Sequence, residues 1–309
     1  MAPEDAPLSA TSTLTQADES IRQPWIGSSS SRPSRCVRVI APPSFSLSTI
    51  VTGIRTLLQY TDLFYTLSLF RLNVRYKQSV LGWVWAALQP LALMGIYTFV
   101  FSHVAKVNTN GTAYPAFVFC GLLPWIFFSS SVTNAVHGIV AYPTLLTKMY
   151  FPREIIPLSY LAAGVVDFAI ASVILVGMLS YYHVAPTWNL LYAAPILAVL
   201  GAFAAAVALL FAAIQVRFRD IGLALPFLLQ IWMFATPVVY SFQAVPQRLR
   251  SLYLFDPVAG AIHMFRSVVL YGQPPDPRLI IFTCGLTVIV LLVAYAYFKA
   301  SEAAMADLV

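Results

Sequence analysis

Apolar residues gather in six long stretches after about residue 80, and short polar segments separate these stretches. A helix needs roughly 20 consecutive apolar residues to cross the hydrocarbon core of a bilayer. Each stretch reaches that length. The pattern therefore predicts an all-α integral membrane protein with six transmembrane helices, at about 82–104, 114–138, 156–183, 189–216, 221–241 and 279–299.

A seventh apolar piece, PVAGAIHMFRSVVLYG at 257–272, is too short to cross the membrane. It carries Arg266 and offers only about 14 helical residues, against the roughly 20 that a span requires. Lipid satisfies no backbone polar group, so such a piece must be buried in protein or lie at the interface. We expect an interfacial or re-entrant helix before the last span.

The segment before the first span, residues 62–81, combines an apolar stripe with basic residues. Arg71 and Arg75 flank the stripe and Lys77 follows it; the stripe itself consists of Leu63, Leu67, Phe70 and Val74. This spacing indicates an amphipathic helix in the cytoplasmic interface, where cations favour anionic headgroups. The alternative is a plain basic flank on a membrane helix.

Two tryptophans stand where this segment meets the first span. Trp83 and Trp85 are expected to anchor the helix end, because amphipathic rings favour the membrane interface. Gly82 is the predicted bend between the interfacial helix and the first span.

The composition supports a membrane protein. The 309 residues are 59% hydrophobic and only 10% charged, whereas a soluble domain carries about 25% charged residues. Residues 1–43 differ from the rest, since they are rich in Ser, Thr, Pro and Ala and contain no apolar run typical of a secretory signal. We expect a disordered tail at 1–43 and one membrane domain over 44–309.

The basic residues predict an orientation. Thirteen of the 18 Lys and Arg residues fall in the tail, the loops and the C-terminus of one side, and five fall on the other. Cytoplasmic loops carry the excess of Lys and Arg, so both termini are expected in the cytoplasm. The same rule explains the net charge of +6 without invoking nucleic acid.

The usual enzymatic motifs are absent from the sequence. There is no G-x-x-x-x-G-K-[ST] phosphate loop and no G-x-S-x-G, and the four His and three Cys residues have no metal-ligand spacing. Asp256 and Asp276 lie on the outer side and are flanked by prolines. They are interpreted as turn residues rather than as a carboxylate pair.

Asp167 is an acid about ten residues into the third predicted span. A charge near mid-bilayer costs about 2.5–3.5 kcal/mol on insertion scales and suggests a function by default. The spans offer it no basic partner. A structural hydrogen bond to a neighbouring helix, or simple protonation, is therefore favoured over proton coupling.

The cytoplasmic loop at 141–154 is framed by two prolines. Pro143 can begin a helix and Pro152 must end one. The framed helix, 143–152, is predicted to dock a soluble partner, although an ordinary loop is the alternative. Its docking residues are expected to be Thr144, Leu145, Leu146, Lys148, Met149 and Tyr150.

Aromatic residues are frequent in the first and fifth predicted spans. Such rings usually serve packing or face lipid, but pyranose faces also stack on aromatic rings. The candidates for lining a sugar path are Tyr97, Phe101, Trp232, Phe234 and Tyr240.

Seven blocks, taken in order and spacing, resemble the membrane subunit of type-2 ABC exporters that carry O-antigen, teichoic acid, capsule and related cell-envelope glycans. The resemblance covers about residues 40–309. The blocks are VRYKQSVLGWVWAALQP (74–90), YPAFVFCGLLPWIFF (114–128), LLTKMYFPREIIPL (145–158), VVDF (165–168), QVRFRDIGLALPFLLQIWMFATPVVY (215–240), DPVAGAIHMFR (256–266) and the final MADLV.

The resemblance implies a homodimer in the bacterial inner membrane that binds two separate ATPase subunits, which carry the ATP and Mg, so that this chain is a transport subunit without a cofactor of its own. The family's coupling helix falls on 143–152 and its re-entrant region on 243–272. The pore would lie at the dimer interface beside the first and fifth spans. A polyprenyl-diphosphate-linked glycan would enter near 62–81, where Arg71 stands at a position that is often acidic in the family.

Three alternatives remain at this point. The first is a type-2 ABC permease for another lipid or a drug, and only the seven sequence blocks named above argue against it. A proton-coupled transporter would show paired intramembrane acids or inverted repeats. A membrane-embedded glycosyl- or acyltransferase would need a cluster of acids or histidines on the outer face.

Overall fold

The computed structural model describes residues 59–77, 79–104, 112–141, 151–242, 246, 248 and 252–308. All of them belong to one of the two units of the chain, Pro42–Val309. The predicted tail at 1–43, most of the helix predicted at 143–152 and most of 243–251 lie outside the described residues.

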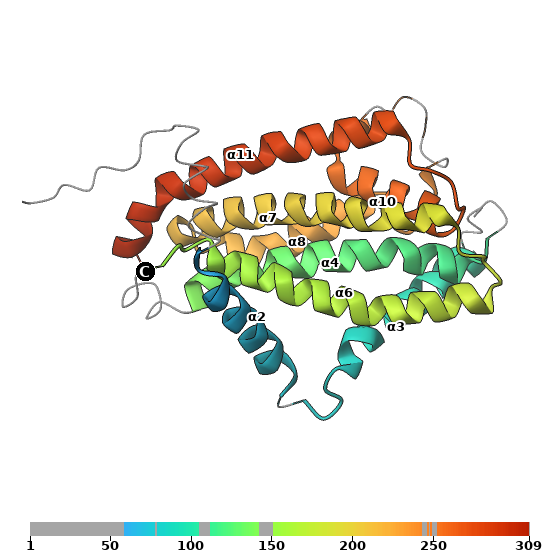
Figure 1. The fold of residues 1–309 in the computed structure, drawn as a ribbon, viewed down its shortest axis with the longest axis horizontal. Helices are drawn as coiled ribbons and strands as arrows, with labels where there is room; N and C mark the ends of the chain where they lie inside the picture. The colour runs from blue at the N-terminus through green and yellow to red at the C-terminus, as the bar shows by residue number, and fades with distance from the viewer. Residues whose placement is uncertain are drawn as a thin grey trace, which may run out of the picture. The chain divides into compact units, whose positions relative to one another are not determined.

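The elements of the described part are helical (Figure 1). The α-helical ones are α2 (Thr61–Tyr76), α3 (Val84–Thr98), α4 (Tyr114–Ala141), α6 (Ile155–Tyr181), α7 (Ala193–Arg217), α8 (Ile221–Ala235), α10 (Pro257–Val269) and α11 (Pro277–Leu308). A π-helical segment, η1 (Phe99–Val104), continues α3, and short 3₁₀ segments, η2 (Trp188–Tyr192) and η4 (Leu252–Phe255), precede α7 and α10. The all-α class of an integral membrane protein is confirmed.

Five helices in the described part are long and apolar enough to cross a membrane: Val84–Ser102, Tyr114–Ala141, Ile155–Tyr181, Trp188–Arg217 and Pro277–Glu302. They correspond to five of the six predicted spans. The remaining one, 221–241, was predicted too long, because α8 has only 15 residues, or about 22 Å. Thr236 is extended at its end, as expected for a residue that precedes a proline. The six-span topology stays a prediction.

α4 is the central helix of the bundle, and it contacts α3, α6, α7, α8 and α10. α11 packs along α7 on the other side of α7 from α4 (Figure 1). Edge-to-face contacts of Trp232 with Phe128 and Phe203 tie α8 into this core. The short α10 is buried against α4, α7 and α11, which satisfies the requirement that a helix too short to span be covered by protein.

α2 and α3 form a V whose point is the turn between them (Figure 1). Gly82 has φ +50°, a left-handed conformation that glycine adopts without strain, so the bend predicted there is found. The predicted helix at 62–81 was too long at its end, because α2 stops at Tyr76. The chain then turns through Ser79–Gly82, where the Gly82 N–H donates to the Ser79 carbonyl at 3.2 Å.

Candidate functional site

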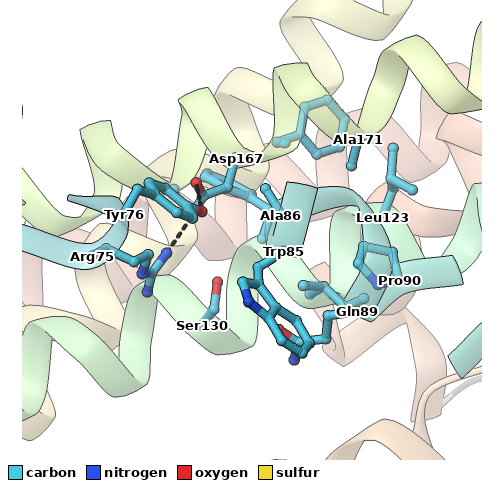
Figure 2. Close-up of a pocket in the computed structure, with 14 residues that line it drawn as sticks. Arg75, Tyr76, Trp85, Ala86, Gln89, Pro90, Leu123, Ser130, Asp167 and Ala171 are labelled. Carbon is cyan, nitrogen blue, oxygen red and sulfur yellow. Dashed lines mark hydrogen bonds and ion pairs between the residues drawn. The ribbon is translucent and has the colours of Figure 1, made fainter. Parts of the chain in front are cut away.

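The end of α2 is fastened to the middle of α6 by an ion pair. Arg75 Nη1 pairs with Asp167 Oδ2, and the neighbouring Tyr76 hydroxyl donates to Asp167 Oδ1 at 2.6 Å (Figure 2). Asp167 lies twelve residues past Ile155 on α6, which places it about 18 Å along the helix. α2 therefore runs beside α6 as far as the level of Asp167, and both carboxylate oxygens are engaged.

Asp167 thus has a basic partner that the sequence analysis missed. No basic residue of the spans was expected to pair with Asp167, and Arg75 comes from α2, the helix that precedes the spans. The Asp167 side chain is 18% exposed and the Arg75 side chain 37%. The acid is mostly covered by protein, while more than a third of the Arg75 side chain remains accessible.

Tyr76 completes this group of three side chains. Burial, and then the hydrogen bond to Asp167, raises the pKa of Tyr76 to about 12. The phenol therefore stays protonated and keeps donating at neutral pH. The Tyr76 ring also stacks on the Trp83 ring, with centroids 4.6 Å apart, so Trp83 is held across the turn by an aromatic contact.

A pocket of about 360 Å³ opens beside the ion pair (Figure 2). Its polar lining includes Arg75, Tyr76 and Asp167, together with Gln89 of α3 and Ser130 of α4. Its remaining wall is apolar and consists of Trp85, Ala86, Pro90, Leu123, Ile126, Phe127, Gly164, Phe168 and Ala171. The pocket offers a charged group at one part of its wall and an extended apolar surface elsewhere.

The three cations predicted to form one surface patch are separated. Arg71 is only 6% exposed, and its guanidinium lies over the Tyr160 ring, 4.4 Å from the centroid. Lys77 is exposed just after α2. Arg71 therefore does not face the surface as predicted, because the position is on the side of α2 that packs against α6. Arg75 and Lys77 remain accessible.

The aromatic residues predicted to line a path are divided among different environments. The Tyr97 hydroxyl lies 3.8 Å from the Met233 sulfur, and the Phe101 ring lies 6.2 Å from the Tyr97 ring. Tyr240 Oη lies 3.0 Å from the Phe234 carbonyl, and the Phe234 side chain is exposed on α8. None of these contacts tests whether the residues line a sugar path at a dimer interface, so that path stays a prediction.

Trp232, the last of these aromatic residues, is linked to an acid that the sequence analysis interpreted as a turn residue. Its Nε1–H donates to Asp256 Oδ2 at 3.2 Å, and the Thr236 hydroxyl donates to the same oxygen at 2.8 Å. Asp256 Oδ1 caps α10 by accepting from the Val258 N–H at 3.0 Å. Asp276 accepts from the Arg278 N–H at 2.9 Å near the start of α11. Each acid therefore accepts a backbone hydrogen bond at the start of a different helix.

Glu154 is a buried acid that the sequence analysis passed over. Its side chain is 1% exposed, and Lys299 Nζ of α11 lies 2.9 Å from Oε1. The Tyr295 hydroxyl donates to the same carboxylate at 3.3 Å. Glu154 follows Pro152 by two residues, so this group fastens α11 to the chain just after the predicted docking helix. The docking residues themselves, 144–150, lie outside the described residues.

The described residues contain no cluster of three or more His, Cys, Asp or Glu side chains that could hold a metal ion. The groups beside Arg75 and Asp167 provide charge pairing, hydrogen bonding and apolar contact, which can bind and position a ligand.

The chain is similar in sequence to several transport proteins. The O-antigen export system permease protein RfbA of Myxococcus xanthus is 33% identical over 168 residues, 54% of this chain and 64% of that protein. A protein of the same name from Klebsiella pneumoniae is 33% identical over 151 residues, 48% of this chain and 58% of that protein. The polysialic acid transport protein KpsM of Escherichia coli is 31% identical over 75 residues, 24% of this chain and 29% of that protein. The chain spans less than two thirds of the length of each of these relatives.

The model of the ABC-2 type transporter family matches residues 62–270. These residues run from the first turn of α2 to the end of α10, and they include Arg75, Tyr76, Asp167 and Arg266. The match covers about two thirds of the 309 residues. The chain belongs to the ABC-2 type transporter family.

Proposed function

We propose that this chain is the permease subunit of an ATP-driven exporter that moves a polyprenyl-diphosphate-linked cell-envelope polysaccharide across the cytoplasmic membrane. The observation that carries the proposal is the family match over residues 62–270, the part that forms most of the helical bundle. Relatives named O-antigen export system permease protein and polysialic acid transport protein support a polysaccharide as the cargo.

The chain works with partners. It forms a homodimer and binds two copies of an ABC ATPase, which hold the ATP and Mg, as its resemblance to type-2 ABC exporters implies. Its sequence contains no phosphate loop. The helix at 143–152 docks on the ATPase. The buried Glu154–Lys299 ion pair supports this assignment, since it links the chain directly after that helix to α11.

The protein spans the inner membrane of a bacterium, with both termini in the cytoplasm. Five long apolar helices and the cation distribution support this localisation. A proton-coupled transporter is less favoured, because the intramembrane acid Asp167 is paired with Arg75 rather than with a second acid.

The lipid-linked substrate is recruited at the pocket beside Arg75. A guanidinium binds a diphosphate through several N–H donors, and Arg75 is 37% exposed although it also pairs with Asp167. Lys77 adds an exposed charge nearby. The apolar wall formed by residues such as Phe127 and Phe168 suits an isoprenoid chain.

The test is co-expression with a cognate ATPase in a strain that makes a lipid-linked glycan. The chain alone should hydrolyse no ATP, and the pair should export glycan and co-purify. Leu146→Asp with Met149→Asp should abolish export and weaken the complex, because the two changes would bury unpaired charge in an apolar socket. Leu146→Ile with Met149→Leu is the matched control. Normal ATPase binding by the double Asp variant would contradict docking through 143–152.

A further inference from the structure

A second pocket of about 450 Å³ lies around Arg266 on α10, apart from the pocket beside Arg75. It falls within the range of about 300–1,000 Å³ that small-molecule sites occupy. It is lined by Phe117, Pro237, Ser241, Phe242, His263, Arg266, Ser267, Tyr271 and Gln273. The lining combines aromatic rings, hydrogen-bonding groups and one buried guanidinium.

Arg266 is fixed in place although it is only 5% exposed. Nη1 donates to the Pro237 carbonyl at 2.7 Å, Nη2 donates to the Val238 carbonyl, and the guanidinium lies 4.0 Å from the Phe117 ring centroid. Its Nε atom is buried and has no hydrogen-bond partner among the described residues. One donor of a rigidly held cation is therefore left unsatisfied at the pocket wall.

Among the residues that the structure describes, no acid balances the positive charge of Arg266. None of the ion pairs in the described part of the chain includes it, and residues 105–111 and 243–251 of the sequence contain no Asp or Glu. Asp256 and Asp276 lie before and after α10 in the sequence, and each accepts a backbone hydrogen bond at the start of a helix. Burial lowers the pKa of Arg266 to about 10, so the side chain stays charged at neutral pH.

The rest of the lining suits a sugar ring. Phe242 and Tyr271 line the pocket with aromatic rings on which a pyranose can stack. Ser267 donates its hydroxyl to the His263 carbonyl at 3.1 Å, which leaves its oxygen lone pairs for a ligand hydroxyl. Gln273 adds an amide with two donors and an acceptor.

We propose that this pocket binds an acidic sugar unit, with the acid group paired to Arg266 and the ring held between the aromatic side chains. A buried cation requires a counter-charge, and a carboxylate or phosphate on a saccharide supplies one where the described residues do not. The inference rests on the proposed function in that a saccharide is the expected cargo, and it adds that the cargo carries acid groups.

Binding to the purified full chain in nanodiscs, without an ATPase, tests the proposal. Titration calorimetry with glucuronate and with glucose 6-phosphate distinguishes a carboxylate from a phosphate as the acid group. Glucose provides the same ring without charge and should bind about tenfold more weakly or worse. Inorganic phosphate provides charge without a ring. Glucose binding as tightly as the acidic sugars, or inorganic phosphate doing so, overturns the assignment of an acidic sugar.

Two variants locate the binding. Arg266→Gln should abolish it, but this change also removes the bonds to the Pro237 and Val238 carbonyls. Ser267→Leu fills the pocket and leaves those bonds in place, so it should reduce affinity about tenfold or more while the protein unfolds at an unchanged temperature. Ser180→Leu, at an exposed position of α6, is the matched control and should bind normally. Unchanged binding by Ser267→Leu overturns the proposal.

The outcome is independent of the transport assay. A chain that binds glucuronate through Arg266 but exports no glycan would leave the sugar site standing and remove the proposed function. A chain that exports glycan but binds neither acidic sugar would support the proposed function and remove the acidic-sugar site.

Discussion

Arg75 and Asp167 are 92 residues apart in the sequence and form an ion pair that joins α2 to the middle of α6. The pair neutralises the acid of the third predicted span with a cation from outside the spans. Tyr76 hydrogen-bonds the same carboxylate. The contact joins the end of α2 to α6 beside the pocket that both residues line.

The first prediction concerns the strength of the ion pair. Arg75→Gln, Asp167→Asn and the double variant form a cycle in which the coupling free energy of unfolding should be about 0.5–1 kcal/mol, because Arg75 is more than one third exposed. Denaturant unfolding in detergent measures it. Lys77→Gln, which changes an exposed cation just after the same helix, should not couple to Asp167→Asn. Strict additivity of Arg75→Gln and Asp167→Asn would show that the pair contributes nothing.

The second prediction separates substrate recruitment from orientation. Arg75→Gln with Lys77→Gln leaves eleven of the thirteen cations predicted on the cytoplasmic side, so the chain should insert correctly and bind its ATPase. Export should nevertheless fall, because the diphosphate group loses its donors. Asp167→Asn is the matched control, since it also breaks the ion pair but keeps both cations, and it should retain most export. Normal export by the double variant would mean that these charges only orient the chain.

The third prediction is a pH dependence that arises from Tyr76. The pKa of its phenol is raised from 10.0 to about 12 in the folded chain, so the protonated form stabilises the fold fully below pH 10 and this contribution disappears as the pH rises through 12. The stability of the wild type should therefore fall toward that of Tyr76→Phe over this range. Tyr65→Phe, at an exposed position of α2, should follow the wild type. Parallel stability curves for the wild type and Tyr76→Phe would exclude this role.

Periodicity and hydropathy predicted much of the fold, because the length of an apolar run is a local property. Five long helices follow from it, whereas the bend at Gly82 was predicted from the glycine itself. The ends of α2 and α8 were less predictable. α8 stops before Thr236 and Pro237 although the apolar run continues, and hydropathy does not register the backbone restriction that a proline imposes on its neighbour.

The partners of the charged side chains depend on tertiary contacts that the sequence does not display. Asp167 and Arg75 were both singled out, but their pairing requires α2 to lie against α6. The signal that existed was one intramembrane acid near a segment rich in cations. Arg71 is in the same segment, and only packing decides that it is buried while Arg75 is accessible. The family resemblance located segments and left these pairings undetermined.

The fourth prediction is an asymmetry between the two members of the buried ion pair. Lys299→Met leaves the carboxylate of Glu154, which is 1% exposed, without a cation and should cost about 3–5 kcal/mol in unfolding free energy. Glu154→Gln leaves Lys299 beside Glu302, whose Oε2 lies 3.1 Å from Nζ, and should cost about 1–3 kcal/mol. Denaturant unfolding of both variants provides the comparison. A larger loss of stability for Glu154→Gln than for Lys299→Met would show that Lys299 depends on Glu154 more than Glu154 depends on Lys299.

The last prediction compares two helical glycines that differ only in what surrounds them. An added Cβ at Gly121 of α4 would overlap a terminal nitrogen of Arg266 and would approach the Val238 carbonyl oxygen to 2.7 Å. The guanidinium is held by two carbonyls and cannot withdraw without losing them, so Gly121→Ala should destabilise the protein by about 1–3 kcal/mol. Gly177→Ala on α6 meets nothing within 4 Å and should stabilise by up to about 1 kcal/mol, because alanine favours the helix. Thermal unfolding of the two variants side by side should move in opposite directions. Equal shifts would show that Arg266 is free to move, and the rigid cation on which the acidic-sugar site depends would then be absent.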